Sequence, residues 1–323
     1  MVSAILMAGY SNRRAVKKYS RIVAENYGQK FIESGYKPLR EFTTLKDGQE
    51  ERKPLIQYTL ETLFEIDLID EIVIVGHQML LEQRLGNFIK EFKKPCRIVN
   101  QNSIITPDVI QNFNIIPRKV KHNSIAGNFI KGYTATAACR NKTPALFIAA
   151  DSPLTPKQFI VHFLDIVQNS ENQADIVFPA VFIDEDNDKL GRRPLKLLND
   201  TPCHVSDKTD PYGRQGFRLS GLMFANPHTF DVNTVNTAYS LRKWLSPNVQ
   251  LRLFRITEGL GYPNVYSKYF IRKDLSIREI ENITTEFFRG RLKLIPMSGE
   301  EATYDYDGTD FEYRMISEML KSA

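Results

Sequence analysis

Residues 2–13 read VSAILMAGYSNR, an apolar run that ends at Gly9 and passes into polar and basic residues. A continuous apolar run of this length is typical of a strand that is buried on both faces, and the glycine predicts a turn directly after it. Apolar residues near helical spacing follow at residues 14–34, before Gly35. The start of the chain therefore predicts a strand, a turn and a helix.

The rest of the first half continues to alternate between strand and helix patterns. Buried strands are predicted at residues 71–76, 96–100 and 145–150, and helices at residues 55–63, 79–92 and 124–139. Such alternation predicts an α/β fold of three layers, α/β/α, with a mostly parallel central sheet. Ligands of these sheets bind outside the carboxyl ends of the strands, where Gly9 and Asp151 are both expected.

The second half of the sequence is less regular. Strands are predicted at residues 174–183, 217–225, 292–296 and 302–307, helices at residues 234–245, 276–288 and 309–320, and an exposed loop at residues 184–211. No internal repeat and no low-complexity linker interrupts the sequence. We therefore expect a single elaborated domain over residues 1–323.

The composition is that of an ordinary globular protein, with 42% hydrophobic and 25% charged residues in a chain of 323. The formal charge is 43 − 38 = +5, but the basic residues are scattered, which argues against a nucleic-acid partner. The three cysteines lie far apart and the first residues lack the pattern of a secretory signal, so we expect a cytoplasmic protein without a zinc site. No apolar run approaches the roughly 18 residues of a membrane span, so no membrane partner is expected.

The turn after the first strand is a candidate phosphate site. Gly9 lets the backbone approach a phosphate closely, the amides at the start of the following helix favour an anion, and Arg13 would add charge-assisted hydrogen bonds. The segment is neither a dinucleotide fingerprint nor a P-loop, because no further glycines and no Gly-Lys-Ser/Thr follow. The alternative is an ordinary turn with basic residues on the surface.

Two lysines and three acids complete the set of candidates. Lys37 and Lys53 each precede Pro-Leu, and either supply a point charge to phosphate oxygens or are simply solvated. Asp151 follows a buried strand and is either a Mg²⁺ ligand or a cap of the next helix. Asp305 and Asp307 alternate onto one face of a predicted strand, where they would either repel each other in solvent or share a cation. The alternative is that Asp307 or Thr309 caps the last helix.

Taken in order, these segments resemble the motifs of a known family. They are LMAGYSNR at 6–13, KPL at 37–39 and again at 53–55, ADSPL at 150–154, and DYDGTD at 305–310. The series resembles nucleotidyltransferases with the MobA-like NTP-transferase fold, a group that includes enzymes similar to molybdenum-cofactor and sugar-phosphate nucleotidyltransferases. The resemblance implies a Rossmann-like sheet of the nucleotide-diphospho-sugar transferase type, with a nucleotide-binding half at 1–180, an acceptor-binding half at 181–300, and a closing strand and helix at 301–323.

The resemblance also implies roles for individual residues. Arg13, Lys37 and Asp151 would be catalytic, and Asp151 and Asp307 would hold Mg²⁺. The residues that would bind the nucleotide or contact the acceptor form a longer set. The nucleotide-binding residues would be Leu6, Met7, Ala8, Gly9, Tyr10, Ser11, Asn12, Arg13, Lys53, Ser124, Gly127 and Asn128, and the acceptor contacts Arg218 and Gly221.

The sequence departs from the family pattern in three places. Tyr10 replaces a small residue, and Gly308-Thr309 replaces the more usual Thr-Pro after the second acid. The interval before Lys37 holds an inserted amphipathic helix, whose Lys17 or Lys18 competes for the role of that lysine. These departures affect the geometry of the loop and the choice of base.

The resemblance implies an enzyme that transfers a nucleoside monophosphate from an NTP to a phosphorylated acceptor and releases pyrophosphate. The acceptor would be a sugar phosphate, a polyol phosphate or a cofactor. The expected partners are therefore an NTP and a small phosphorylated acceptor, and self-association into a homo-oligomer stays open. One alternative is a glycosyltransferase of the related fold, which usually needs an Asp-X-Asp pair where this chain has Asp151-Ser152-Pro153. Another is a catalytically silent nucleotide-binding scaffold or sensor.

Overall fold

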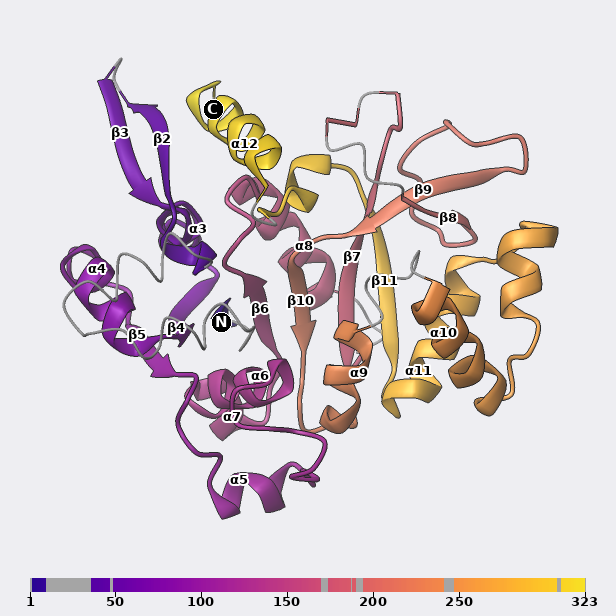
Figure 1. Cartoon of the computed structure of the whole chain (residues 1–323), viewed down its shortest axis with the longest axis horizontal. Coiled ribbons are helices and arrows are strands. Elements are labelled where there is room, and N and C mark those ends of the chain that lie inside the picture. Colours follow the sequence, from indigo (N-terminus) through magenta and orange to yellow (C-terminus); the bar gives the residue numbers. More distant parts are fainter. Residues whose placement is uncertain are drawn as a thin grey trace.

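A computed structural model shows a central sheet covered by helices (Figure 1). The structure describes residues 2–9, 36–46, 49–169, 174–186, 188–189, 194–240, 247–306 and 309–322. The inserted helix predicted at residues 14–34 lies outside these ranges.

Within the described residues, nine strands form the main sheet, in the order β5-β4-β1-β6-β10-β7-β9-β8, with β11 paired to β7. The strands are β1 (Val2–Ala8), β4 (Ile69–Gly76), β5 (Cys96–Asn100), β6 (Ala145–Ala149), β7 (Ile176–Phe182), β8 (Leu195–Leu198), β9 (Arg214–Leu219), β10 (Leu222–Ala225) and β11 (Leu292–Met297). The pairings set β9 and β10 against the direction of the other seven strands. The sheet is thus mixed but mostly parallel, which confirms the predicted α/β class.

The first strand lies in the middle of the sheet because it is apolar on both faces. β1 runs parallel to β4 on one side and to β6 on the other. Its side chains alternate between two cores, with Ala4 and Leu6 in one and Ile5 in the other. All three are fully buried. This placement brings the carboxyl end of β1 between the carboxyl ends of two parallel neighbours.

Helices cover both faces of the sheet. The α-helices of the described residues are α3 (Leu55–Phe64), α4 (Gln78–Lys90), α5 (Pro107–Asn112), α6 (Ile125–Thr134), α7 (Ala137–Asn141), α8 (Lys157–Asn169), α9 (Val235–Ser240), α10 (Pro247–Gly259), α11 (Ile277–Phe288) and α12 (Asp310–Ser322). The buried side chains of α3, α4 and α8 share a core with Leu6, whereas those of α6 and α11 share the opposite core with Ile5. The two cores and the sheet between them are the three layers that the alternating pattern predicts.

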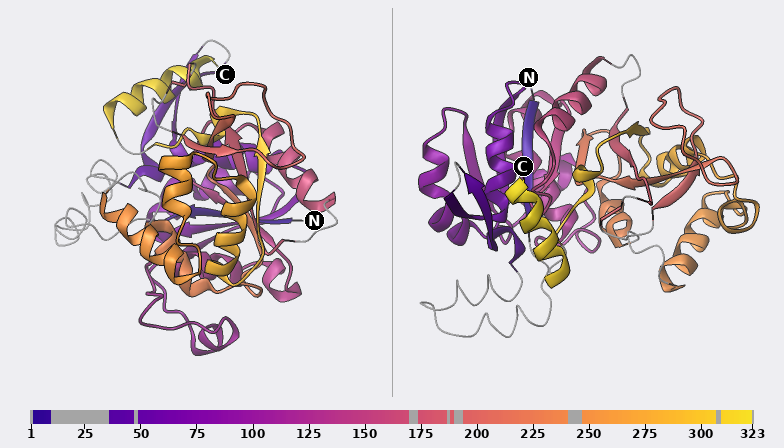
Figure 2. Two further views of the ribbon diagram at one scale, coloured as in Figure 1. Left: turned by 90° about the vertical axis from the view of Figure 1, so that its right-hand side faces the viewer. Right: turned by 90° about the horizontal axis from the view of Figure 1, so that it is seen from above.

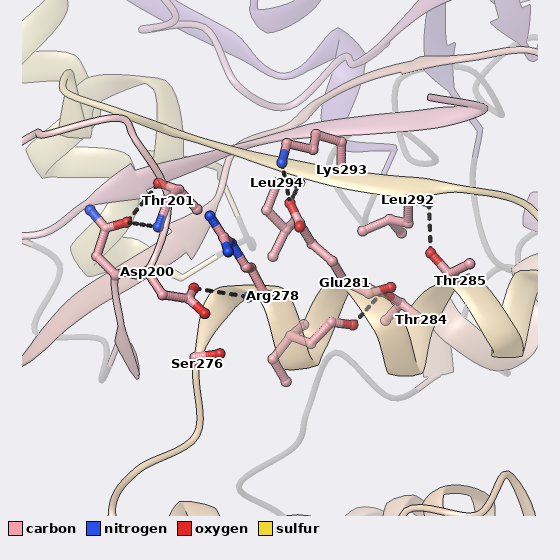
Figure 3. A network of polar contacts seen from close by, with 12 residues as sticks. Asp200, Thr201, Ser276, Arg278, Glu281, Thr284, Thr285, Leu292, Lys293 and Leu294 are labelled. Atoms are coloured by element: carbon pink, nitrogen blue, oxygen red, sulfur yellow. Dashed lines mark hydrogen bonds and ion pairs between the residues drawn. The ribbon is translucent and has the colours of Figure 1, made fainter. Parts of the chain in front are cut away.

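Seen from above, the elements of the first and second halves of the chain lie side by side (Figure 2). In the second half, α11 is tied to β11 by Glu281, which accepts a hydrogen bond from the Leu294 amide (2.8 Å) and pairs with Lys293 (3.5 Å) (Figure 3). The amide of Arg278, at the start of the same helix, donates to Asp200 (3.1 Å) in the loop after β8. These contacts join α11 to β11 and to the loop after β8.

A hairpin and the last helix form a third, smaller core. β2 (Glu41–Lys46) and β3 (Gln49–Pro54) pair as a two-stranded sheet, and α12 lies beside them (Figure 1). Phe42 of the hairpin, Ile316 of α12 and Tyr306 are all buried in this cluster. The Thr44 hydroxyl donates to the Leu320 carbonyl (2.7 Å) and fastens the helix to the hairpin.

The strand predicted at residues 302–307 is wrong. Glu300–Thr303 form a 3-10 helix, and residues 304–306 belong to no strand. Tyr304 and Tyr306 alternate inward and are buried, which produced the strand-like pattern. The Tyr306 amide donates to the Asp151 carbonyl (2.8 Å) and joins no ladder.

The predicted loop at residues 184–211 and the predicted strand at 217–225 also need correction. The four-residue strand β8 lies inside the former, and the latter is divided into β9 and β10 at Ser220 and Gly221. No helix among the described residues is long and apolar enough to cross a membrane.

Candidate active site

The carboxyl ends of the neighbouring strands β1 and β6 bring two predicted site segments together. Met7 is paired with Ala149 in the ladder, and the Ala150 amide donates to the Met7 carbonyl (3.3 Å). Gly9 directly follows β1, and Asp151 lies two residues after the end of β6. The expectation that both residues lie at the carboxyl edge of the sheet is therefore confirmed.

Gly9 is pressed against two amide side chains. A Cβ atom at this position would lie 2.6 Å from Nδ2 of Asn128 and 3.2 Å from Oε1 of Gln101. A side chain at this position would therefore force either the turn or the Asn128 amide to shift. Leu6 and Ala8 are fully buried, so only their backbone could serve a ligand at this turn.

The N-terminus of α6 faces the same region. Ser124 caps the helix, its hydroxyl accepting from the Gly127 amide (3.1 Å). A Cβ at Gly127 would lie 2.3 Å from the Lys121 carbonyl oxygen, so this glycine allows the preceding loop to pack on the helix. Asn128 is 4% exposed, and its Oδ1 has no hydrogen-bond partner within the described part of the chain. A buried acceptor of this kind is costly unless a ligand or water satisfies it.

Lys37 and Asp151 face each other at the end of the sheet. The distance between Nζ of Lys37 and Oδ2 of Asp151 is 3.9 Å, with the two side chains 30% and 31% exposed. Lys37 begins a 3-10 turn, Lys37–Leu39, in which Pro38 and Leu39 are buried. The lysine therefore extends from an anchored turn, and its side chain is accessible to solvent.

Lys53 occupies a different environment. It lies on β3 with its side chain 10% exposed, and its Nζ contacts Oε1 of Glu61 (3.0 Å) and Oε2 of Glu51 (3.1 Å). Burial alone would lower the pKa of Lys53, but the two carboxylates outweigh burial and raise it. Its charge is thus balanced inside the protein before any ligand binds.

Of the two predicted acceptor contacts, Gly221 lies beside the Asp151 turn. A Cβ at Gly221 would be 2.6 Å from the Ser152 hydroxyl oxygen, and the Gly221 carbonyl accepts from the Ala149 amide (2.8 Å). Arg218 is on β9 and forms a buried ion pair with Asp188, with Nη1 2.9 Å from Oδ1. This pair balances the charge of the arginine.

Several predicted residues lie outside the described part of the chain. They are Tyr10, Ser11, Asn12, Arg13, Lys17, Lys18, Asp307 and Gly308.

Two buried residues of this region were not among the predicted site residues. Gln101 follows β5 and is fully buried against Gly9. Lys131 of α6 is also buried, and its ammonium donates to the carbonyls of Gln101 and His122, the latter at 2.7 Å. Burial lowers the pKa of Lys131 to about 8. A signal was available for each, because Gln101 directly follows a predicted strand and Lys131 lies about one helical turn after Asn128.

Asp151 is an acid of this region that could serve as a ligand of a Mg²⁺ ion. The described residues contain no group of three or more His, Cys, Asp or Glu side chains that could hold an ion. Mg²⁺ commonly binds one or two carboxylates together with substrate phosphates and water. The Asp151 carboxylate, about one third exposed, fits that requirement.

Three solved structures are similar to this chain to different degrees. A hypothetical transferase from Thermus thermophilus superimposes with a TM-score of 0.53 at 16% identity, covering 95% of this chain and 97% of that one. The 4-diphosphocytidyl-2C-methyl-D-erythritol synthase from Anaerococcus prevotii gives a TM-score of 0.43 at 11% identity (99% and 98% covered), and HddC from Yersinia pseudotuberculosis gives 0.46 at 14% (99% and 100% covered). No protein-family model and no curated protein matches the sequence. The likeness to the Thermus thermophilus protein establishes a shared α/β fold.

Proposed function

We propose that this chain is a Mg²⁺-dependent nucleotidyltransferase that moves a nucleoside monophosphate from an NTP to a phosphorylated acceptor and releases pyrophosphate. One observation carries the proposal: the Lys37–Asp151 pair and the Gly9 turn packed on Asn128 lie at the ends of adjacent parallel strands. The pair offers a cation for phosphate oxygens and a carboxylate for a metal ion. The turn offers a backbone that a nucleotide can approach.

The nucleotide would bind between the Gly9 turn and the N-terminus of α6. Backbone amides at a helix N-terminus favour anions, and the capped start of α6 lies beside Asn128. The unsatisfied Oδ1 of Asn128 would accept a hydrogen bond from the base or the sugar. Arg13, by its likeness to the family loop, would contact the triphosphate.

The proposed reaction follows from the charges of Lys37 and Arg13. An oxygen of the acceptor phosphate attacks the α-phosphorus, the bond from that phosphorus to the bridging oxygen breaks, and pyrophosphate leaves with the bonding electrons. Lys37 and Arg13 would stabilise the negative charge that develops. A phosphate acceptor is already ionised near neutral pH, so no general base is required.

Asp151, together with Asp307, would hold Mg²⁺. When bound, this ion neutralises phosphate oxygens and orients the triphosphate. The Lys37 amine lies 3.9 Å from the Asp151 carboxylate, so the same carboxylate holds the lysine in place before the ion and the NTP arrive.

The acceptor would bind on the Gly221 side of Asp151. Gly221 packs on Ser152, so a ligand bound here would meet the backbone of residues 220–221. Arg218 would take part only if an acidic acceptor displaced Asp188 from its ion pair.

The proposal is tested by measuring pyrophosphate release with Mg²⁺, each of the four NTPs, and a panel of sugar phosphates, polyol phosphates and phosphorylated cofactors. Release that requires one NTP together with one acceptor supports the proposal and names both substrates. Tight NTP binding without release for any acceptor would favour a silent sensor. Absence of both binding and release would contradict a nucleotide site altogether.

A further inference from the structure

The Tyr36 hydroxyl joins the ends of two central strands. It donates a hydrogen bond to the Ala8 carbonyl (2.9 Å) at the end of β1 and accepts one from the His77 amide (3.0 Å) directly after β4. Ala8 and Gly76 are partners in the β1–β4 ladder. The Tyr36 hydroxyl therefore links β1 and β4 just beyond the last residue pair of their ladder, next to Gly9.

The surroundings of the Tyr36 ring are shaped to hold it. The residue is fully buried. A Cβ at Gly76 would lie 2.6 Å from the Tyr36 hydroxyl oxygen and 2.7 Å from the Ala8 carbonyl oxygen, so a side chain at Gly76 would displace the phenol. The ring centroid of His77 is 6.4 Å from that of Tyr36.

The backbone of Tyr36 fixes the turn that carries Lys37. The Tyr36 carbonyl accepts from the Leu39 amide (3.1 Å), and the Lys37 carbonyl accepts from the Arg40 amide (3.0 Å). Pro38 and Leu39, which follow the lysine in the sequence, are buried. Lys37 is thus held from both sides along the chain, and its amine reaches to within 3.9 Å of Asp151.

We propose that Tyr36 is a positioning residue for nucleotidyl transfer, whose hydroxyl anchors the Lys37 turn to the ends of β1 and β4 and so sets Lys37 opposite Asp151. This inference rests on the proposed function and goes beyond it, because it assigns a role to a buried phenol outside the phosphate-binding motifs. Tyr36 acts through Lys37 and touches no substrate.

The variant Tyr36→Phe removes the hydroxyl and keeps the ring. We expect kcat to fall about tenfold while KM for the NTP changes less than about threefold, because the lysine stabilises charge mainly in the transition state. The matched control is Tyr133→Phe, which also loses a fully buried hydroxyl that donates to a backbone carbonyl, that of Thr143 (2.7 Å). Thr143 lies just before β6, so the Tyr133 hydroxyl is near the amino-terminal end of that strand, whereas Asp151 follows its carboxyl end. We therefore expect the control to leave kcat within about twofold.

Two further readouts separate positioning from a loss of stability. In a Lys37→Ala background, Tyr36→Phe should lower kcat by less than about twofold, because residues that act through one another are not additive. Amide hydrogen exchange at His77 should accelerate in Tyr36→Phe, since that amide loses its acceptor.

An unchanged kcat in Tyr36→Phe, an equal loss with and without Lys37, or unchanged exchange at His77 would each overturn the role of Tyr36 while an active wild type leaves the proposed function standing. A wild type that transfers no nucleotide would overturn the proposed function and this role together.

Discussion

Nζ of Lys37 lies 3.9 Å from Oδ2 of Asp151, and each of the two side chains is about one third exposed. An ion pair of this length and exposure contributes little to stability, typically about 0–1 kcal/mol. The fold itself therefore gains little from bringing these two residues together. Their position at the carboxyl edge of a parallel sheet, beside a glycine turn, is instead the arrangement expected of a ligand site.

Asp151→Asn should remove activity and leave the fold intact. The substitution keeps the size of the side chain but removes the charge that would hold Mg²⁺, so we expect kcat to fall by about two orders of magnitude or more. Because the ion pair is half-exposed, the free energy of unfolding should change by less than about 1 kcal/mol. Steady-state kinetics and urea unfolding check both statements.

The control for that variant is Asp165→Asn, which neutralises an exposed acid on α8. Its kcat should stay within about twofold of the wild type, as for most surface changes. If Asp151→Asn kept wild-type turnover, Asp151 could not have the role we assign to it.

Gly9→Ala should impair nucleotide binding. The new methyl group would lie 2.6 Å from Nδ2 of Asn128, so either the turn or the amide must move. Such overpacking typically costs about 1–3 kcal/mol of stability, and we expect a tenfold or larger rise in Kd for the NTP, roughly the effect of losing one well-placed hydrogen bond. Calorimetric titration measures the affinity directly.

Gly86→Ala is the matched control for Gly9→Ala. Gly86 lies in α4 and a Cβ there would meet nothing within 4 Å, so the change should stabilise the protein by about 0.5–1 kcal/mol without altering NTP affinity. Equal effects of the two alanines on affinity would argue against a nucleotide at the Gly9 turn.

Lys131 should make stability depend on pH above neutrality. Burial lowers its pKa to about 8 from the usual 10.5, so between these values the folded state binds fewer protons than the unfolded state. The free energy of unfolding therefore rises with pH in this window. Relative to Lys131→Met, the wild type should gain about 1–2 kcal/mol between about pH 7.5 and about pH 9.5. Urea unfolding of both proteins at the two pH values tests this, and a difference that stays constant would contradict it.

The third core should depend on the inner face of α12. Ile316 is fully buried in the cluster with Phe42 and Tyr306, so Ile316→Ala should lower the free energy of unfolding by about 2–4 kcal/mol. Phe311 on the same helix is 59% exposed, and Phe311→Ala should cost less than about 1 kcal/mol. Thermal unfolding should rank the two variants in this order, and the reverse order would contradict the packing of α12 on the hairpin.

Local sequence patterns predicted most of the central layer but little of what holds the site together. The apolar run at residues 2–8 predicts β1 because a strand buried on both faces must be apolar throughout. The four-residue strand β8 was missed, and β9 and β10 were predicted as a single strand, because a local pattern does not show which strands pair. The alternation of Tyr304 and Tyr306 was misread as a strand, since the pattern reports burial but not pairing.

Local sequence patterns also predict only part of the candidate site. Gly9 and Asp151 could be placed together because each follows a recognisable strand. The hydrogen bonds of Tyr36 to Ala8 and His77, and the burial of Lys53 between Glu51 and Glu61, depend on tertiary packing that no local pattern contains.

The most direct test of the central claim is to follow the two ends of the triphosphate separately. The NTP and acceptor identified by the panel would be supplied with a ³²P label on either the α- or the γ-phosphate. Nucleotidyl transfer predicts that the α label enters the acceptor product and the γ label appears in pyrophosphate. A γ label on the acceptor, or an α label that stays in a nucleoside diphosphate, would show phosphoryl transfer and contradict the account.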